Sequence, residues 1–297
     1  IGLGADGKAI VADRQFIYRI LPDGSNDSSF NYGSGFNESS VFKTLQRPNG
    51  KYLVAGSFSH FENNFIRALV QFNTDGTKDT TFNTGTGFVY GTIYSLLLLP
   101  DGKIIAGGDF TYNQNGNFYT KLIKINTDGS IDTSFTAPFI NGGVLALGLQ
   151  SDGKIMVGGN FIQINNVADK YLMRLNADGT RDYSFDKGTD FDTQGSSLGV
   201  HTIVIQPDGK ILIGGRFFIY RNEPHNYIMR LLPNGSVDST FQTGDGFNSG
   251  LSKIMLQPDG KIIATGSFTS YDSQSVFGIT KLNSNGSLDT SFTNSFI

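Results

Sequence analysis

Two short turn signals alternate along this chain of 297 residues, and each of them occurs six times. One is Asp/Asn-Gly-Lys and the other is Asp/Asn-Gly-Ser/Thr. Asp-Gly and Asn-Gly between apolar segments are the strongest short signals for a β-hairpin, because the turn needs positive φ at its central residues. The first signal begins at Asp6, Asn49, Asp101, Asp152, Asp208 and Asp259. The second begins at Asp23, Asp75, Asp128, Asp178, Asn234 and Asn285.

Two hairpins in every repeat of about fifty residues predict four antiparallel strands per repeat. In the third repeat we expect strands at 93–99, 104–110 and 122–126, and a short fourth strand at 132–135. Four strands at this period are the signature of propeller blades. The sequence therefore predicts an all-β fold, a six-bladed β-propeller with four antiparallel strands in each blade. The expected single domain, 1–297, divides into blades at about 1–36, 37–88, 89–140, 141–191, 192–247 and 248–297.

Phenylalanine and glycine follow the same period. Seventeen of the 25 Phe residues occupy three positions of the repeat: the fourth strand, the end of the second strand and the loop after the fourth strand. This regularity predicts packing of blade against blade, where loss of one ring to Ala costs about 3–5 kcal/mol. The second strand also ends in a small pair, such as Gly158-Gly159 or Gly214-Gly215. Glycine inside a strand indicates that another backbone comes close, as expected where blades converge on an axis.

The sixth repeat carries a family resemblance. It reads Leu-Gln-Pro-Asp-Gly-Lys-Ile-Ile at 256–263, Gly-Ser-Phe-Thr at 266–269, Lys-Leu-Asn at 281–283 and Asn-Gly-Ser-Leu-Asp-Thr-Ser-Phe at 285–292. Together these strings resemble the bacterial delta-60 repeat, a propeller-type repeat, and the resemblance extends over the whole chain. It implies a β-propeller within a large secreted or surface-anchored bacterial protein. It implies no catalytic residues.

Composition excludes several classes of function. The chain has no cysteine, which excludes disulfides, thiolate metal sites and a Cys nucleophile. Its 23 basic and 26 acidic residues form no basic patch, so we expect no nucleic-acid partner. No apolar run approaches the roughly 18–20 residues of a membrane span, so we expect no membrane insertion. The chain opens without a leader and both ends fall within one connection between blades, so we expect the protein to continue on one or both sides.

Chemical motifs are few. Segments 73–79, 126–132 and 176–182 place Asp and Asn oxygens around a glycine, as part of a calcium loop does. The terminal bidentate Glu is missing, so calcium is possible but an Asx turn capped by the second Asp is favoured. The three histidines, His60, His201 and His225, have no metal-binding spacing, and no Gly-x-Ser-x-Gly elbow is present. We expect no cofactor, no metal and no enzymatic activity.

The repeat is irregular at two places. In the first repeat 15 residues separate Lys8 from Asp23, where later repeats have 24 or 25. This shortening is either an ordinary atypical end repeat or a notch in one rim that receives a ligand or a neighbouring domain. The longest loop follows the fourth repeat, with an inserted stretch at Asp190–Gly199. Long loops on a rigid scaffold are where binding residues usually lie.

The connections on one face are rich in aromatic and amide side chains, which suit protein or glycan surfaces, although the rings could equally fill gaps between blades. We expect Tyr94, His201 and Lys253, which open first strands, to lie nearest the axis on this face. With Asp109 and Arg216 they form a candidate ligand-binding pocket. The aromatic residues of these connections are Phe61, Phe65, Tyr112, Phe118, Tyr119, Tyr171, Tyr220, Tyr227 and Tyr271.

Three functions follow from these patterns. The favoured one is a non-enzymatic recognition or scaffold module of an exported bacterial protein, extracellular or on the cell surface, that binds protein or glycan through the loop-rich face. The second is a structural spacer that packs on neighbouring domains of the same chain. The third is a propeller hydrolase or lactonase with a metal in the axial channel, which no residue spacing supports.

Overall fold

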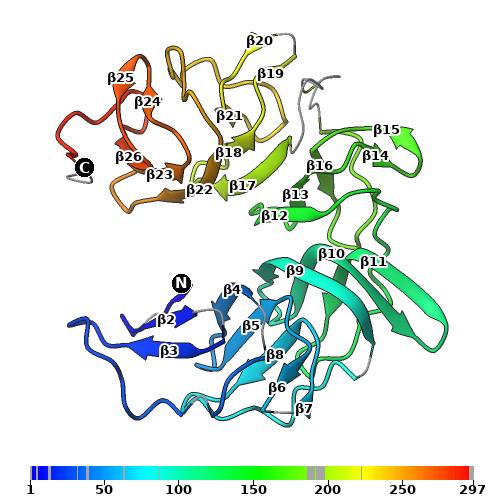
Figure 1. Cartoon of the computed structure of the whole chain (residues 1–297). Helices are drawn as coiled ribbons and strands as arrows, with labels where there is room; N and C mark the ends of the chain where they lie inside the picture. The colour runs from blue at the N-terminus through cyan, green and yellow to red at the C-terminus, as the bar shows by residue number, and fades with distance from the viewer. Residues whose placement is uncertain are drawn as a thin grey trace. The chain divides into compact units, whose positions relative to one another are not determined.

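The computed structural model describes residues 2–4, 6–12, 15–31, 33–37, 40–62, 64–85, 87–185, 191, 198–221 and 223–293. The chain forms two compact units, Ile1–Thr136 and Ala137–Ile297, and each is described by itself. Every regular element among the described residues is a β-strand (Figure 1). In that part of the chain no helix has the length and apolar character needed to cross a membrane.

The described part of the first unit contains three antiparallel sheets of three strands each. First strands of consecutive sheets contact one another, so the sheets pack face to face with these strands together. The first sheet is β1 (Gly2–Leu3), β2 (Ala9–Ala12) and β3 (Ile17–Ile20). The second is β4 (Val41–Gln46), β5 (Tyr52–Gly56) and β8 (Leu69–Phe72). The third is β9 (Phe88–Leu98), β10 (Ile104–Gln114) and β11 (Asn117–Ile125).

The described residues of the second unit repeat this plan. Its sheets are β12 (Val144–Leu149), β13 (Ile155–Gly159) and β16 (Leu172–Leu175); β17 (Gly199–Ile205), β18 (Ile211–Arg216) and β21 (Ile228–Leu231); and β22 (Leu251–Leu256), β23 (Ile262–Gly266) and β26 (Ile279–Leu282). Small hairpins interrupt four of the connections between second and third strands. They are β6 (His60–Phe61) with β7 (Asn64–Phe65), β14 (Gln163–Ile164) with β15 (Val167–Ala168), β19 (Ile219–Tyr220) with β20 (Glu223–Pro224), and β24 (Ser270–Tyr271) with β25 (Gln274–Ser275).

The predicted turns are confirmed. The glycine of every turn signal has positive φ, for example 79° at Gly50 and 88° at Gly76. The first turn joins the first and second strands of its sheet in antiparallel register, as Ile104 opposite Leu98 shows for β10 and β9. The first signal of each repeat therefore places the first two strands correctly. In the third repeat, however, β9 begins at Phe88, five residues before its expected start, β10 continues to Gln114, and β11 begins at Asn117, five residues early.

The expected fourth strand at 132–135 is wrong. Ile131 makes a single bridge to Ile125, and the following residues form a turn in which the Phe135 amide donates to the Asp132 carbonyl at 3.2 Å. The Asp132 carboxylate accepts bonds from the amide and the hydroxyl of Ser134, at 3.1 and 2.6 Å. These local bonds give the backbone a partner other than a neighbouring strand, so the ladder stops after one bridge.

The hydrophobic core lies between consecutive sheets, where the repeated Phe residues pack. Those at the end of the second strand, such as Phe58 and Phe110, are at most 1% exposed. The described Phe residues of the other two positions are buried or half-buried, except Phe139, which is 51% exposed. There the next residue, Ile140, is buried and bridges Ile164, so it takes the structural place that Phe has in other repeats. Phe296 lies outside the described residues.

The two positions of each glycine pair require a small residue for different reasons. A β-carbon at Gly159 would lie 2.1 Å from the carbonyl oxygen of Gly143, within the same sheet. This close approach comes from a β-bulge, because Val144 pairs with Gly159 while Ala146 pairs with Gly158. A β-carbon at Gly158 would instead lie 2.5 Å from Cγ1 of Val200 on the next sheet. Packing of neighbouring sheets thus explains only the first glycine of the pair.

Candidate binding site

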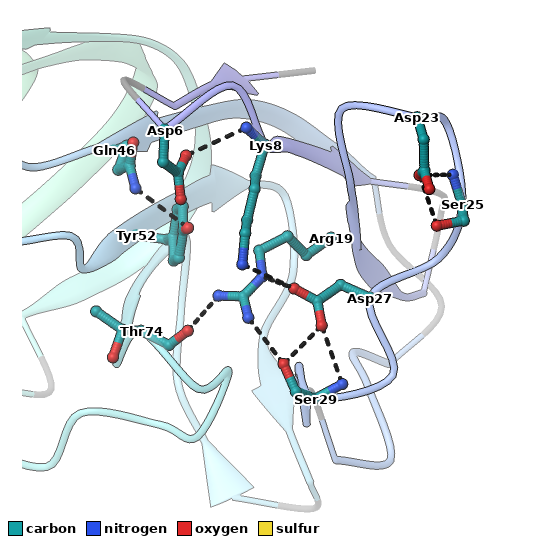
Figure 2. A network of polar contacts seen from close by, with 10 residues as sticks. All are labelled: Asp6, Lys8, Arg19, Asp23, Ser25, Asp27, Ser29, Gln46, Tyr52 and Thr74. Carbon is teal, nitrogen blue, oxygen red and sulfur yellow. Dashed lines mark hydrogen bonds and ion pairs between the residues drawn. The ribbon is translucent and has the colours of Figure 1, made fainter.

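A buried aspartate after the second turn joins both hairpins of a repeat. In the first repeat, Asp27 Oδ1 accepts bonds from the amide and hydroxyl of Ser29 at 3.1 and 2.6 Å. Its Oδ2 accepts from Arg19 Nε at 2.8 Å and from Lys8 Nζ at 3.2 Å (Figure 2). Lys8 belongs to the first turn and Arg19 to β3, so one carboxylate ties the two hairpins together. The equivalent residues, each paired with the Lys of its own first turn, are Asp79, Asp132, Asp182, Asp238 and Asp289.

The guanidinium beside this aspartate also reaches the next sheet. Arg174 Nε donates to Asp182 at 2.7 Å, while its Nη1 donates to the Pro233 carbonyl, in the second turn of the next repeat, at 2.6 Å. The same link between sheets runs from Arg19 to Thr74 and from Arg230 to Ser284. Each arginine therefore fastens one sheet to the turn of the following one.

The second repeat makes this link from a different position. Its third strand carries Gln71, and Arg47, after β4, supplies the guanidinium. Arg47 Nη1 donates to Gln71 Oε1 at 2.6 Å and to the Thr127 carbonyl at 3.1 Å, and Nη2 donates to the Gly102 carbonyl at 2.7 Å. Gln71 Nε2 then donates to Asp79 at 2.6 Å. The arginine and the glutamine have exchanged places, and the link to the next turn is kept.

These contacts keep the aspartates ionised. The bonds from Lys103 and Ser134 lower the pKa of Asp132 to about 2. At Asp79 burial acts in the opposite direction, yet the bonds from Lys51 and its other donors outweigh it and hold the pKa below the usual range. A carboxylate stabilised by several donors in its charged form is a structural anchor. This anchoring role therefore explains why every repeat has Asp at this position.

The favoured interpretation of segment 73–79 as an Asx turn is confirmed. Asp75 Oδ1 accepts bonds from the amide and the hydroxyl of Thr77, at 3.0 and 2.7 Å. The expectation that the second Asp caps this turn is wrong, because Asp79 instead caps the turn that follows, through Thr81. Among the residues that the structure describes, no three His, Cys, Asp or Glu side chains group as metal ligands would. Calcium binding, the interpretation that was not favoured, remains a prediction.

The five predicted pocket residues fall in both units. In the first unit, half-buried Tyr94 lies on β9, 5.3 Å from the ring of Phe42, and exposed Asp109 on β10 forms an ion pair with Lys121. Only the other three predicted residues belong to the second unit. The prediction that all five line one pocket therefore remains a prediction.

In the second unit His201 and Arg216 come from adjoining strands. The half-buried His201 ring on β17 has Nδ1 3.2 Å from the Leu251 carbonyl, and desolvation together with the nearby Arg216 charge lowers its pKa. Exposed Arg216 ends β18, and its Cγ is one of the atoms nearest to Gly250. Lys253 on β22 is exposed, although desolvation lowers its pKa. Three cationic or basic groups therefore lie on consecutive sheets.

The β-bulge identifies residues that the sequence patterns did not single out. Tyr94 and His201 are the extra residues of the bulges in β9 and β17. The same register change leaves Phe42, Leu145 and Ser252 as the extra residues at the equivalent place in β4, β12 and β22. Lys253 is one position further along. The bulge position can be found from the sequence, because each bulge residue lies on the first strand, opposite the small pair that ends the second strand.

Most aromatic side chains of the connections fill the core. Six of the nine are buried: Phe61, Tyr112, Tyr171, Tyr220, Tyr227 and Tyr271. Tyr119 is partly buried against the same core. Only Phe65, at 51%, and Phe118, at 66%, are well exposed. For most of these rings the gap-filling alternative is therefore correct, and two remain available to a partner.

A pocket of about 420 Å³ lies between the first and second sheets. Lys8 and Arg19 line it from the first sheet, and Gln46 and Tyr52 from the second (Figure 2). Residues of the turns line it, among them Asp6, Gly50 and Asp75. The shortened connection of the first repeat, predicted as a notch, includes residues 13 and 14, which lie outside the described residues. The inserted stretch Asp190–Gly199 lies outside the described residues, apart from Phe191, Leu198 and Gly199.

Solved structures of similar fold have low sequence identity. Virginiamycin B lyase from Staphylococcus aureus is 15% identical and covers 95% of this chain and 83% of that one, with a TM-score of 0.59. A protein of unknown function from Bacteroides caccae is 11% identical (95% and 90% covered, TM-score 0.49). A gluconolactonase from Xanthomonas campestris is 12% identical (88% and 80% covered, TM-score 0.48). At 15% identity the likeness to the lyase concerns the fold alone. A comparison with curated protein sequences finds no match.

One family profile matches the chain repeatedly. Its description is a β-propeller domain of unknown function, DUF5122, and it matches residues 47–82, 99–135, 150–185, 206–241 and 257–292. Each match runs from the first turn signal to the Phe after the buried aspartate. The first repeat is unmatched, although Lys8, Arg19 and Asp27 have the same arrangement there. Since the matches cover more than half of the residues, this chain belongs to the DUF5122 β-propeller family.

Proposed function

We propose that this chain is a non-enzymatic recognition or scaffold module that binds a protein or glycan surface through its loop-rich face. The observation that carries the proposal is the exposure of aromatic rings in two consecutive repeats. Phe65 is 51% exposed on β7, Phe118 is 66% exposed on β11, and Tyr90 is 62% exposed on β9. Exposed aromatic rings on a scaffold are typical anchors of recognition surfaces.

The hairpins that carry these rings are held firmly at their bases. Buried Phe61 is 5.0 Å from Phe72 in the sheet below, and buried Tyr112 donates to the Thr84 carbonyl at 2.9 Å. Ordering the hairpins in advance reduces the entropy lost on binding. Rigid connections with exposed tips therefore support recognition better than mobile loops would.

The proposal includes the complete architecture. The six repeats form six blades that close into one propeller of the delta-60 type, with the connections of all blades on one face. The chain then belongs to a larger exported bacterial protein, extracellular or on the cell surface. The resemblance of the repeats supports this location, and the absence of cysteine is compatible with it. Protease treatment of intact cells of the source organism, followed by detection of the chain, tests the location.

Binding is tested with the whole parent protein on a glycan array and in a pull-down. We expect the double variant Phe65→Ala/Phe118→Ala to weaken binding at least about tenfold, because each lost aromatic anchor removes upwards of 1 kcal/mol. Tyr183→Ala is the matched control. Tyr183 is 84% exposed but lies in the turn after the buried Asp182 and belongs to none of the small hairpins.

Two results would contradict the proposal and favour one of the alternative functions. If wild-type protein binds nothing and the double variant only lowers the stability of the parent protein, the structural-spacer alternative is correct. Stoichiometric metal in the purified protein, with hydrolysis of a lactone or ester, would support the enzyme alternative. The lyase activity of the S. aureus protein belongs to that protein, because unrelated functions share the same fold.

A further inference from the structure

Five asparagines of this chain are followed by glycine: Asn49, Asn115, Asn141, Asn234 and Asn285. In such a pair the backbone nitrogen of the glycine can attack the side-chain carbonyl carbon of the asparagine, because glycine has no β-carbon to hinder the approach. The fold decides which pair reacts, because the asparagine side chain must turn toward the glycine amide and that amide must be free to attack.

Two of the five asparagines are held in the second turns of their repeats. Asn234 Oδ1 accepts from the amide and the hydroxyl of Ser236, at 3.1 and 2.8 Å. Asn285 makes the same two bonds with Ser287. The glycine amide of each turn is also occupied, and that of Gly235 donates to a backbone carbonyl at 2.9 Å. Both reacting groups are therefore engaged in these two turns.

Two further asparagines are held by backbone amides. Asn49 Oδ1 accepts from the Lys51 amide at 3.2 Å. Asn141 Oδ1 accepts from the amides of Ile162 and Gln163, at 3.0 and 2.9 Å. Turning either side chain toward the next glycine would break these bonds, which slows the attack.

Asn115 differs from the other four. With Gly116 it forms the two-residue tip of the hairpin of β10 and β11, where Gln114 pairs with Asn117 (Figure 1). Its side chain makes no hydrogen bond within the described part of the chain, and both residues of the tip are exposed. A β-carbon at Gly116 would meet no atom within 4 Å, so the space around the attacking amide is open.

One bond still protects the tip. The Gly116 amide donates to Asn113 Oδ1 at 2.9 Å, and this acceptor belongs to a side chain that can rotate away. The φ angles of 53° at Asn115 and 88° at Gly116 are those of a type I′ turn, so the tip must open locally before the amide reaches the side chain. An exposed hairpin tip opens at low cost, because few buried contacts hold it.

We propose that Asn115 is a site of spontaneous deamidation. The Gly116 nitrogen forms a bond to Cγ of Asn115, ammonia leaves with the proton of that nitrogen, and a five-membered imide results. Water then opens the imide at either carbonyl, which gives aspartate or isoaspartate. The reaction needs only water, and it replaces a neutral amide by a carboxylate at the exposed tip.

Isoaspartate changes the shape of the hairpin. Its backbone passes through the β-carbon, so the turn becomes longer by one atom and no longer fits the pairing of Gln114 with Asn117. Phe118 is the next residue of β11 and is displaced with it. The loss of binding that follows rests on the recognition function proposed above, whereas the deamidation itself does not.

Peptide mapping by mass spectrometry tests the reaction in the full chain after incubation at mildly alkaline pH. Lys or Arg separates consecutive Asn-Gly pairs, so trypsin releases each pair in a different peptide. We expect Asn115 to deamidate at least about tenfold faster than each of the other four, with isoaspartate among the products. The other four pairs are matched controls, because they have the same dipeptide within a folded turn.

The same incubation in concentrated urea separates the effect of the fold from that of the sequence. In the unfolded chain we expect all five pairs to react at similar rates, since no turn protects any of them. The proposal is overturned if Asn115 reacts no faster than the other four in the folded protein, or if its preference is equally large in urea.

Binding of fresh and incubated protein to the glycan array and in the pull-down measures the functional consequence. Incubated wild-type protein should lose binding in proportion to its isoaspartate content. The variant Asn115→Gln should keep its binding, because the longer side chain cyclises much more slowly. Full binding by deamidated protein would contradict the displacement of Phe118. If fresh wild-type protein binds no partner, the proposed function is wrong, and the peptide map still decides on the deamidation.

Discussion

Gly215 has no room for a β-carbon, because that atom would lie 2.2 Å from the carbonyl oxygen of Gly199 on the neighbouring strand. At Gly214 the nearest atom is Cδ1 of Ile254, at 2.6 Å, the far end of a flexible side chain. The sequence already contains this contrast, since Ala55 and Thr265 occupy the first place of the pair while the second place is Gly in the second to sixth repeats. A flexible side chain can move aside more easily than the backbone carbonyl of a hydrogen-bonded β-strand, so the second place of the pair is the stricter one.

We therefore expect Gly215→Ala to lower the free energy of unfolding by about 2–3 kcal/mol, the range of an overpacked site. Gly214→Ala should cost less than half of that. Urea denaturation followed by circular dichroism measures both. Equal losses in the two variants would mean that the bulge adapts and that its carbonyl does not require glycine.

The buried aspartates predict how stability depends on pH. Bonds from Lys103 and Ser134 lower the pKa of Asp132 to about 2, and bonds from Lys261 and Ser291 lower that of Asp289 to about 2. The unfolded chain binds these protons more readily, so the stabilisation is complete above the unfolded pKa of about 4. It is lost as pH falls from about 4 to about 2.

Urea midpoints measured across that window should fall with decreasing pH. The variant Asp132→Asn should be less stable at neutral pH and should show a shallower fall. A wild-type midpoint that stays constant down to pH 2 would contradict the role given to these carboxylates.

At the scale of the element, Arg47 and Gln71 are a compensated exchange. Arg47→Gln removes the bonds to the carbonyls of Gly102 and Thr127, and we expect it to lower the free energy of unfolding by about 2–3 kcal/mol. Gln71→Arg restores a guanidinium at the position that Arg174 has in the fourth repeat. The double variant Arg47→Gln/Gln71→Arg should therefore recover most of the loss in a double-mutant cycle. A double variant no more stable than Arg47→Gln would show that the two positions are not interchangeable.

The first and second strands of each sheet were predictable because a turn with positive φ fixes a hairpin locally, as at Gly50. The fourth strand was not predictable, since Asp132 can either pair as a strand residue or fold back on Ser134, and the side-chain bonds decide. Bulge residues such as His201 were partly predictable from the small pair opposite them. The pocket beside Arg19 was not predictable, because residues of two consecutive repeats line it and no single repeat shows how they meet.

At the scale of the whole molecule, the proposed closure of the propeller makes a specific prediction. Within the first unit the Asn31 amide donates to the Asp75 carbonyl at 2.7 Å, which joins the end of one repeat to the second turn of the next. In a closed ring of six repeats, the equivalent pair is Thr293 with Asp23. Since the chain has no cysteine, the variant Asp23→Cys/Thr293→Cys offers two unique thiols.

A short bismaleimide should crosslink these two thiols within one molecule and increase the mobility of the denatured chain on a gel. The control variant Asp75→Cys/Thr293→Cys places one thiol on the wrong repeat and should give little of this product. Equal yields from the two variants would contradict closure between the first and sixth repeats.

The arginine links described above all run the same way, from one repeat to the turn of the next. Such a one-way contact gives a chain of repeats a direction, although the third and sixth repeats have Lys124 and Lys281 at the position of the arginine. A repeat that carries the arginine, such as the fourth, can be duplicated without a new kind of contact, because its copy brings both the donor and the acceptor turn. The arginine contact therefore determines which repeats are neighbours, whereas the packing geometry of the sheets determines how many repeats there are. The backbone bond of the Asn31–Asp75 kind runs in the same direction, so when a ring is prevented from closing, the amide of Thr293 and the carbonyl of Asp23 remain complementary and end-to-end assembly of separate molecules becomes the competing outcome.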